Sequence, residues 1–270
     1  MSKRAYVLQA LALITMIILL IPDIRVFFLH HRLTWGYLIT QSFCLTFTLV
    51  PIVHRLAPML GAVDIPGGRK QHAAPTPLMG GAAIFLGYAL VMILGRDILN
   101  FSVELKGVAL GGTLIFIIGV LDEIWGLTAK IRLIGQLLAV GILYKFGVWM
   151  SFLPDTWWGH TGEIIFTTLW VVGITNALNF LDGLDGLTTD SAGINALFFG
   201  LVALQTNQPF VMLLSLALAG SCLGFLPWNF RRFQPARIFL GDGGSYFLGF
   251  ALAGVGIIGE WGSHSLVGLA

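Results

Sequence analysis

The sequence predicts an all-α, polytopic membrane protein: a helical bundle of about nine spans in one domain covering residues 1–270. Hydrophobic residues make up 57% of the chain and charged residues only 10%. Soluble domains carry roughly 25% charged residues, so this chain has too little polar surface to cover a globule in water. The third observation is a series of apolar runs, each of a length that suits a membrane helix.

The apolar runs are interpreted as helices, because a segment in lipid must satisfy its own backbone hydrogen bonds and no strand-like alternation is present. The first run follows Lys3 and Arg4 and ends in Pro22-Asp23 without a small-residue cleavage site, which favours an uncleaved span over a signal peptide. Small residues such as Gly111-Gly112 and Gly254 let such helices pack closely. The runs cover residues 5–22, 34–54, 78–95, 107–121, 131–150, 163–180, 191–205, 209–227 and 245–259.

The placement of lysine and arginine predicts a cytoplasmic N-terminus. With nine alternating spans, ten of the 15 basic residues fall on the N-terminal side of the membrane and five on the other, and basic loops stay in the cytoplasm. Seven acids fall on that inside face: Asp64, Asp122, Glu123, Asp182, Asp185, Asp190 and Asp242. The inside loops are therefore expected to carry the chemistry. A net charge of only +2 and the lack of a basic run argue against a nucleic-acid partner.

The stretch NALNFLDGLDGL, residues 176–187, places polar side chains where a span leaves the bilayer. Asn176, Asn179 and Asp182 share a helix face at a spacing of three, and Asp185 continues it if the helix persists. The glycines between the acids allow a sharp turn or a close approach to a ligand. A solvated helix end is the simpler alternative.

A second acidic motif, GVLDEIWGL at residues 119–127, ends the fourth run with adjacent Asp122 and Glu123. Like charges this close repel unless a cation or a proton lies between them. A solvated turn explains such a pair equally well.

A third motif, PARIFLGDGGSYFLGF at residues 235–250, places Asp242 among glycines just before the last run. Ser245 is available as a helix cap, and a glycine-rich entry to a helix is a natural cradle for phosphate. Taken alone, this signal is weak.

The fourth motif, GGRKQHAAPTPLMGG at residues 67–81, supplies positive charge from Arg69, Lys70 and His72, with prolines before the third run. By itself it is typical of a cytoplasmic anchor. Together, however, the four motifs combine carboxylates with basic residues, Arg237 included, on one membrane face. Mg²⁺ is usually held by one or two carboxylates plus substrate phosphates. The combination indicates phosphoryl transfer.

In this order the four motifs resemble the polyprenyl-phosphate N-acetylhexosamine-1-phosphate transferases, over residues 50–259. The spacing of RKQHAAPTP is closer to the undecaprenyl-phosphate N-acetylglucosamine-1-phosphate branch than to the peptidoglycan translocase. The resemblance implies Mg²⁺-dependent transfer of N-acetylhexosamine-1-phosphate, most simply that of N-acetylglucosamine, from a UDP-sugar to undecaprenyl phosphate. UMP is released, and synthesis of a cell-envelope polysaccharide such as O-antigen lipopolysaccharide begins. Mn²⁺ is an alternative metal, and a homodimer is an option.

The resemblance also implies roles for individual residues. Asp242 matches a Mg²⁺ ligand, and Asp122 matches an acid that takes the proton of the lipid phosphate or helps to organise the metal. Asp182 and Asp185 match the pair that lines the nucleotide-diphosphate and metal site. The substrate-binding candidates are Lys70, His72, Asn176, Asn179 and Arg237.

The chain departs from the family pattern in three respects. Glu123 stands where the family usually has aspartate, and we expect it to support the site rather than to react. The family continues beyond the ninth span to a histidine-rich loop that His264 does not match, so the chain is either a fragment or a short form. Residues 1–33 are expected to form an added N-terminal span.

Two other functions stay open. A truncated homologue could bind lipid phosphate without turnover. A transporter would place its ionisable residues near the bilayer midplane rather than at one face. The expected location is the bacterial inner membrane, with the active site cytoplasmic.

Overall fold

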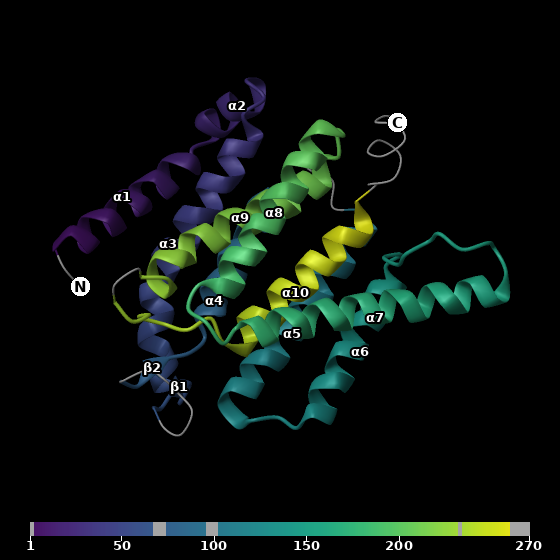
Figure 1. The fold of residues 1–270 in the computed structure, drawn as a ribbon. Helices are drawn as coiled ribbons and strands as arrows, with labels where there is room; N and C mark the ends of the chain where they lie inside the picture. The colour runs from purple at the N-terminus through teal and green to yellow at the C-terminus, as the bar shows by residue number, and fades with distance from the viewer. Residues whose placement is uncertain (1–2, 67–73, 96–101, 232–233, 260–270) are drawn as a thin grey trace.

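The computed structural model of the protein describes residues 3–66, 74–95, 102–231 and 234–259. These residues form ten α-helices and one pair of short strands (Figure 1). In chain order the elements are α1 (Lys3–Leu19), α2 (Pro22–His30), α3 (Thr34–Met59), β1 (Val63–Asp64), β2 (Thr76–Pro77), α4 (Gly80–Leu94), α5 (Val103–Trp125), α6 (Ala129–Lys145), α7 (Trp157–Leu181), α8 (Leu187–Gln205), α9 (Pro209–Asn229) and α10 (Gly241–Ile258).

Each of the nine predicted apolar runs coincides in large part with one helix, so the all-α prediction is confirmed for the described residues. Helix α2 is an addition that the sequence analysis did not predict. It begins at Pro22, directly after the first run, and is bent by 77° from α1. Proline is well suited to the first position of a helix, where its missing N–H is not needed, and there it starts a new helix instead of continuing the old one.

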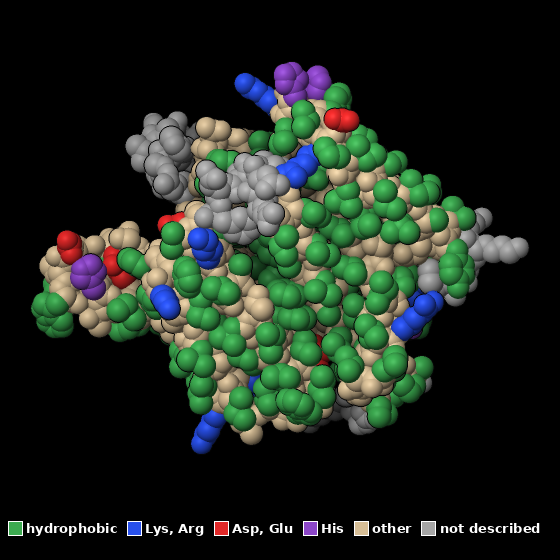
Figure 2. Space-filling model, turned by 180° about the vertical axis from the view of Figure 1, so that it is seen from behind, with side chains coloured by type: hydrophobic (Ala, Val, Ile, Leu, Met, Phe, Trp, Pro, Cys, Tyr) green, Lys and Arg blue, Asp and Glu red, His purple; other side chains and the backbone are tan. Residues whose placement is uncertain are grey.

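Within the described part of the chain, six helices are long and apolar enough to cross a membrane, or seven if α1 and α2 form one broken span. Helix α4 has 15 residues and α6 has 17, both short of the typical span of about 20. The polytopic membrane class is thus confirmed, while the total of nine spans stays a prediction. Figure 2 shows the hydrophobic side chains that cover most of one face of the molecule.

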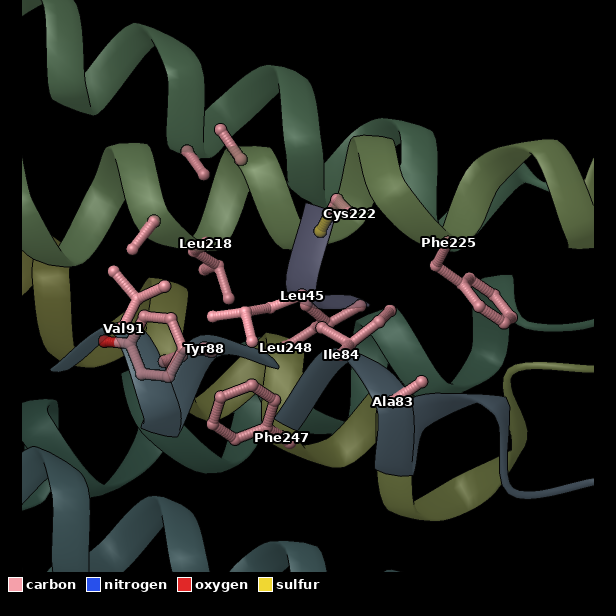
Figure 3. Close-up of a cluster of buried hydrophobic side chains, with 14 of the residues drawn as sticks. Leu45, Ala83, Ile84, Tyr88, Val91, Leu218, Cys222, Phe225, Phe247 and Leu248 are labelled. Carbon is pink, nitrogen blue, oxygen red and sulfur yellow. The ribbon is translucent and has the colours of Figure 1, made fainter. Parts of the chain in front are cut away.

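The core lies where α3, α4, α9 and α10 meet. Figure 3 shows Leu45 of α3, Tyr88 of α4, Leu218 of α9 and Phe247 of α10 packed together. Helices α9 and α10 are the most enclosed spans, with 72% and 78% of their central residues buried, against 17% in α7. Helix α7 therefore lies at the periphery, and its N-terminal half extends beyond the rest of the bundle in Figure 1.

Close backbone contacts hold the start of α4, the end of α5 and the start of α10 together. A Cβ on Gly81 of α4 would overlap the backbone of Gly244 in α10, and a Cβ on Gly119 of α5 would overlap that of Gly243. Only glycine permits such an approach. The first turn of α10 is therefore enclosed by two other helices, with Asp242 in it.

The strands β1 and β2 pair antiparallel, with Val63 opposite Pro77 and Asp64 opposite Thr76. Two-residue strands are too short to produce the alternating pattern that predicts a strand. They bring the chain after α3 back beside the chain that enters α4.

Candidate active site

The helix ends that carry the acidic motifs surround a cleft of about 1040 Å³. Carboxylates from four separate segments reach it: β1, the end of α5, the turn after α7 and the start of α10. All four of the acids predicted as catalytic or metal-binding lie in its wall. The acidic side chains that line it are Asp64, Asp122, Glu123, Asp182, Asp185 and Asp242.

Glycines with positive φ lie at three of the helix ends that carry these acids. Helix α5 is terminated by Gly126 at φ 63°, and Gly186 at φ 82° precedes α8. Gly241 at φ 80° is the first residue of α10. Only glycine adopts these angles without a steric penalty. The glycines in the acidic motifs thus make the sharp turns that leave the carboxylates at the cleft.

Asp242 is held by Asn179, which lies 63 residues earlier in the chain. The Asn179 Nδ2 donates to Asp242 Oδ1 at 2.7 Å and to Ser245 Oγ at 3.0 Å. The predicted capping role of Ser245 is wrong, because α10 begins after Leu240 without a side-chain cap in the described structure. The Ser245 hydroxyl donates to the Asp242 carbonyl at 3.3 Å instead.

Asn176, one turn earlier than Asn179 on α7, does not face the cleft. Its amide exchanges two hydrogen bonds with Gln136 of α6, at 2.9 Å and 3.1 Å. Gln136 is 4% exposed, and a buried amide pair of this kind satisfies both partners and joins the two helices. The predicted contact of Asn176 with substrate stays a prediction.

The adjacent acids Asp122 and Glu123 point to different partners. Asp122 Oδ1 accepts a hydrogen bond from Leu127 N at 2.7 Å, and its Oδ2 lies 3.4 Å from Nη1 of Arg132. Glu123 Oε1 accepts from Gly243 N at 2.8 Å. The two side chains are thus directed toward different partners, a guanidinium and a backbone N–H, and each of these contacts favours the ionised form.

Asp182 and Asp185 lie in the turn between α7 and α8. Burial raises the pKa of the Asp182 carboxyl well above its usual range, and the negative charges of Asp242 and Asp185 add to this effect, while a backbone hydrogen bond from Gly241 opposes it. Asp185 Oδ2 accepts from Ala236 N at 3.4 Å. A site that raises the pKa of a carboxyl in this way favours a cation or a proton.

Two residues that hold parts of the cleft wall in place were not assigned a role from the sequence. Asn229, at the end of α9, lines the cleft, accepts from Gly186 N at 2.6 Å and donates to the Ile238 carbonyl at 3.0 Å. From the sequence, Arg132 is only one of the basic residues that predict the cytoplasmic side of the membrane. A single asparagine or arginine near the end of a span gives no signal, since its partners lie on other elements of the fold.

Three predicted substrate-binding residues lie elsewhere or outside the described structure. The guanidinium of Arg237 lies 5.5 Å from the ring centroid of Trp228, and Arg237 is not among the described residues that line the cleft. Lys70 and His72 lie outside the described residues. The strands on either side of them, β1 and β2, both contribute residues to the cleft wall.

The donor set fits a magnesium ion that is completed by substrate. No group of three His, Cys, Asp or Glu side chains in the described residues is arranged to hold a metal by itself. Mg²⁺, however, is commonly bound by one or two carboxylates together with substrate phosphates. Within the described structure, Asp122 Oδ2 is buried and accepts no hydrogen bond, with Arg132 Nη1 3.4 Å away, so this carboxylate oxygen can still take a cation as a partner.

Comparison with known proteins agrees with the family resemblance of the sequence motifs. A model of glycosyl transferase family 4 matches residues 105–260. The chain is 36% identical over 223 residues to a probable undecaprenyl-phosphate N-acetylglucosaminyl 1-phosphate transferase of Bacillus subtilis, covering 81% of this chain and 61% of that protein. It is 38% identical over 222 residues to a decaprenyl-phosphate N-acetylglucosaminephosphotransferase of Mycobacterium tuberculosis, covering 74% and 54%.

A phospho-N-acetylmuramoyl-pentapeptide-transferase of Streptococcus mutans is 34% identical over 242 residues, covering 80% of this chain and 70% of that protein. The chain spans 54–61% of the length of the N-acetylglucosamine-phosphate relatives. The matched residues contain the ends of α5, α7 and α10 that carry the acids.

Proposed function

Because this chain belongs to glycosyl transferase family 4, we propose that it transfers N-acetylglucosamine-1-phosphate from a UDP-sugar to polyprenyl phosphate and releases UMP. One observation carries the proposal: the acids of three separate motifs line one cleft at the ends of membrane helices. The printed activities of the relatives from B. subtilis and M. tuberculosis support the choice of N-acetylglucosamine and of a polyprenyl acceptor.

The cleft suits a reaction between one substrate in water and another in lipid. An oxygen of the lipid phosphate attacks the β-phosphorus of the UDP-sugar. The bond from that phosphorus to the oxygen that bridges to the α-phosphorus breaks, and UMP leaves with this oxygen. In such transfers the protein mainly positions the phosphates and neutralises charge.

Each acid has an assigned part in this proposal. Asp122 accepts the proton of the lipid phosphate, because Leu127 N and Arg132 hold its carboxylate in place at the cleft wall. Asp242 and Asp122 are the residues that would hold Mg²⁺, and the bound ion would neutralise charge on the diphosphate. Asp182 and Asp185 face the cleft from the turn after α7 and position the nucleotide diphosphate.

The membrane orientation is part of the proposal. The excess of basic residues on the face that carries the cleft supports a cytoplasmic active site in the plasma membrane, where nucleotide sugars are available. A transporter is disfavoured, because the acids cluster at helix ends and not at mid-span, where carriers bind their substrates.

The test is UMP release by membranes that contain the 270-residue chain, supplied with UDP-N-acetylglucosamine, undecaprenyl phosphate and Mg²⁺. We expect turnover that EDTA abolishes and that Asp242→Asn lowers by roughly 100-fold or more, since the amide lacks the negative charge that would hold the metal, whose charge stabilisation is worth several kcal/mol. Asp155→Asn is the matched control, because its carboxylate lies far from the cleft and is 96% exposed.

Undiminished activity of Asp242→Asn would contradict the site. Binding of both substrates without turnover in the unchanged chain would instead favour a homologue that only binds. A parallel reaction with other UDP-N-acetylhexosamines identifies the sugar.

A further inference from the structure

The first turn of α10 is stabilised from another helix. The first four N–H groups of an α-helix have no partner within the helix and are usually satisfied by a cap. In the described structure the residue before α10, Leu240, provides no side-chain cap. The N–H of Gly243 donates to Glu123 Oε1 of α5 at 2.8 Å, across 120 residues of sequence. Glu123 thus takes the place of a cap.

The backbone around this contact leaves room for the carboxylate and for little else. A Cβ on Gly241 would overlap Glu123 Oε1, and Gly241 also has φ +80°. A Cβ on Gly243 would lie 2.9 Å from the Val120 side chain and 3.2 Å from Glu123 Oε1. The glycines on both sides of Asp242 therefore let the Glu123 carboxylate approach the backbone of the turn.

The length of the side chain matters for this contact. Glutamate extends one carbon–carbon bond, about 1.5 Å, further than aspartate. Because Gly119 already brings the α5 backbone against Gly243, the two backbones cannot move closer to compensate for a shorter acid. At this position a glutamate reaches the Gly243 N–H, and we expect an aspartate to fall short of it.

We propose that Glu123 is a positioning residue for Asp242. It fixes the backbone that follows Asp242, while Asn179 holds the Asp242 carboxylate itself at 2.7 Å. The two anchors come from different helices and, together with the backbone hydrogen bond from Gly241 to Asp182, determine where the Asp242 oxygens lie in the cleft. Glu123 acts as a hydrogen-bond acceptor for Gly243, so its charge is not what the turn requires. The effect on catalysis rests on the proposed function, whereas the positioning of the turn does not.

The proposal separates two conservative substitutions. Glu123→Gln keeps the length and an acceptor oxygen but loses the charge. Glu123→Asp keeps the charge but loses the reach. Positioning predicts that glutamine is the better substitute, whereas a role as a metal ligand or a base predicts that aspartate is. Glu104→Gln, at the opposite end of α5, is the matched control.

The first measurement is hydrogen–deuterium exchange of the purified chain over residues 240–246, without substrate or metal. Loss of the acceptor should raise exchange at Gly243 roughly tenfold or more in Glu123→Ala and Glu123→Asp, since a buried donor left unpaired is costly. Glu123→Gln and Glu104→Gln should match the unchanged chain. Equal exchange at Gly243 in all variants that fold would overturn the proposal. If Glu123→Ala does not fold, the pair of glutamine and aspartate variants still decides.

The second measurement is UMP release as a function of Mg²⁺ concentration. We expect Glu123→Gln to keep most of the kcat and the half-saturating Mg²⁺ concentration, and Glu123→Asp to lower the first and raise the second, each by about tenfold or more. An aspartate variant more active than the glutamine variant would overturn the proposal. Absence of turnover in the unchanged chain contradicts the proposed function, and the exchange experiment then tests the positioning of the turn alone.

Discussion

The carboxylates in the cleft differ in their electrostatic environment because their neighbouring groups differ. Asp122 lies beside a guanidinium and Asp242 beside an amide. Asp182 has the carboxylates of Asp242 and Asp185 near it, and burial removes it from water. Removal from water and like charges both disfavour an ionised carboxyl. The turn after α7 is therefore a position in the cleft where a negative charge destabilises the folded chain.

This leads to a prediction on pH and stability at Asp182. Its folded pKa lies above that of the unfolded chain, so the folded state binds more protons and stability falls as pH rises above about 4. In EDTA, we expect Asp182→Asn to melt at a higher temperature than the unchanged chain at pH 7.5. The difference should shrink toward pH 4 and on addition of Mg²⁺.

Thermal melting in detergent across this pH range measures the effect, with Asp155→Asn as an exposed control. A melting temperature of Asp182→Asn that equals that of the unchanged chain at every pH would show that the raised pKa has no energetic consequence. A gain in stability with a loss of UMP release is typical of residues kept for function.

At the level of helices, the site depends on how closely α4, α5 and α10 approach one another. Gly80 N and Gly81 N donate to the carbonyls of Phe239 and Leu240, at 2.9 Å and 2.8 Å. The start of α4 thus holds the segment that leads into α10. The glycine contacts between these helices fix the start of α10 against α4 and α5, and with it the position of Asp242 in the cleft wall.

Gly81→Ala should therefore affect both stability and activity. Its Cβ would overlap the backbone of Gly244, which no side-chain rotation relieves, and overpacking of this kind costs roughly 1–3 kcal/mol. We expect a lower melting temperature and at least a tenfold loss of UMP release, because the start of α10 is displaced. Gly141→Ala on α6 is the control, since its Cβ meets no atom within 4 Å. Equal effects of the two substitutions would argue against the close approach.

At the scale of the whole molecule, the cleft and the long outer end of α7 lie at opposite ends of the bundle. Leu184, in the cleft wall, is 68% exposed, and Asp155 precedes the N-terminus of α7. Asp155 and Glu163 both contact His160, at 2.9 Å and 3.6 Å, so this outer end has its own polar cluster. The excess of basic residues at the cleft side predicts which end faces the cytoplasm.

Cysteine labelling tests this orientation. A cysteine at position 155 should react with a membrane-impermeant maleimide in intact cells, whereas a cysteine at position 184 should react only after permeabilisation. The native Cys44 and Cys222 are buried and should give little background. The reverse pattern would place the cleft outside the cytoplasm and contradict the proposed use of a nucleotide sugar.

The sequence by itself determined the membrane class, most of the helical segments and four of the six acids that line the cleft. These follow from composition, from the length of apolar runs and from local motifs such as DGLDG, in which neighbouring residues carry the whole signal. The bend before α2 and the strand pair were missed because one proline and four residues give too little pattern.

Only the tertiary structure decided how the acids are held. The contacts of Asn179 with Asp242 and of Glu123 with Gly243 join residues far apart in the chain, and the contact of Arg132 with Asp122 joins two different helices. It also decided that Asn176 pairs with Gln136 and that Arg237 packs on Trp228. A spacing of three places side chains on one helix face, but the neighbouring helix determines which of them reach the cleft. That depends on where helices can approach, which glycines such as Gly81 and Gly119 permit only in the folded bundle.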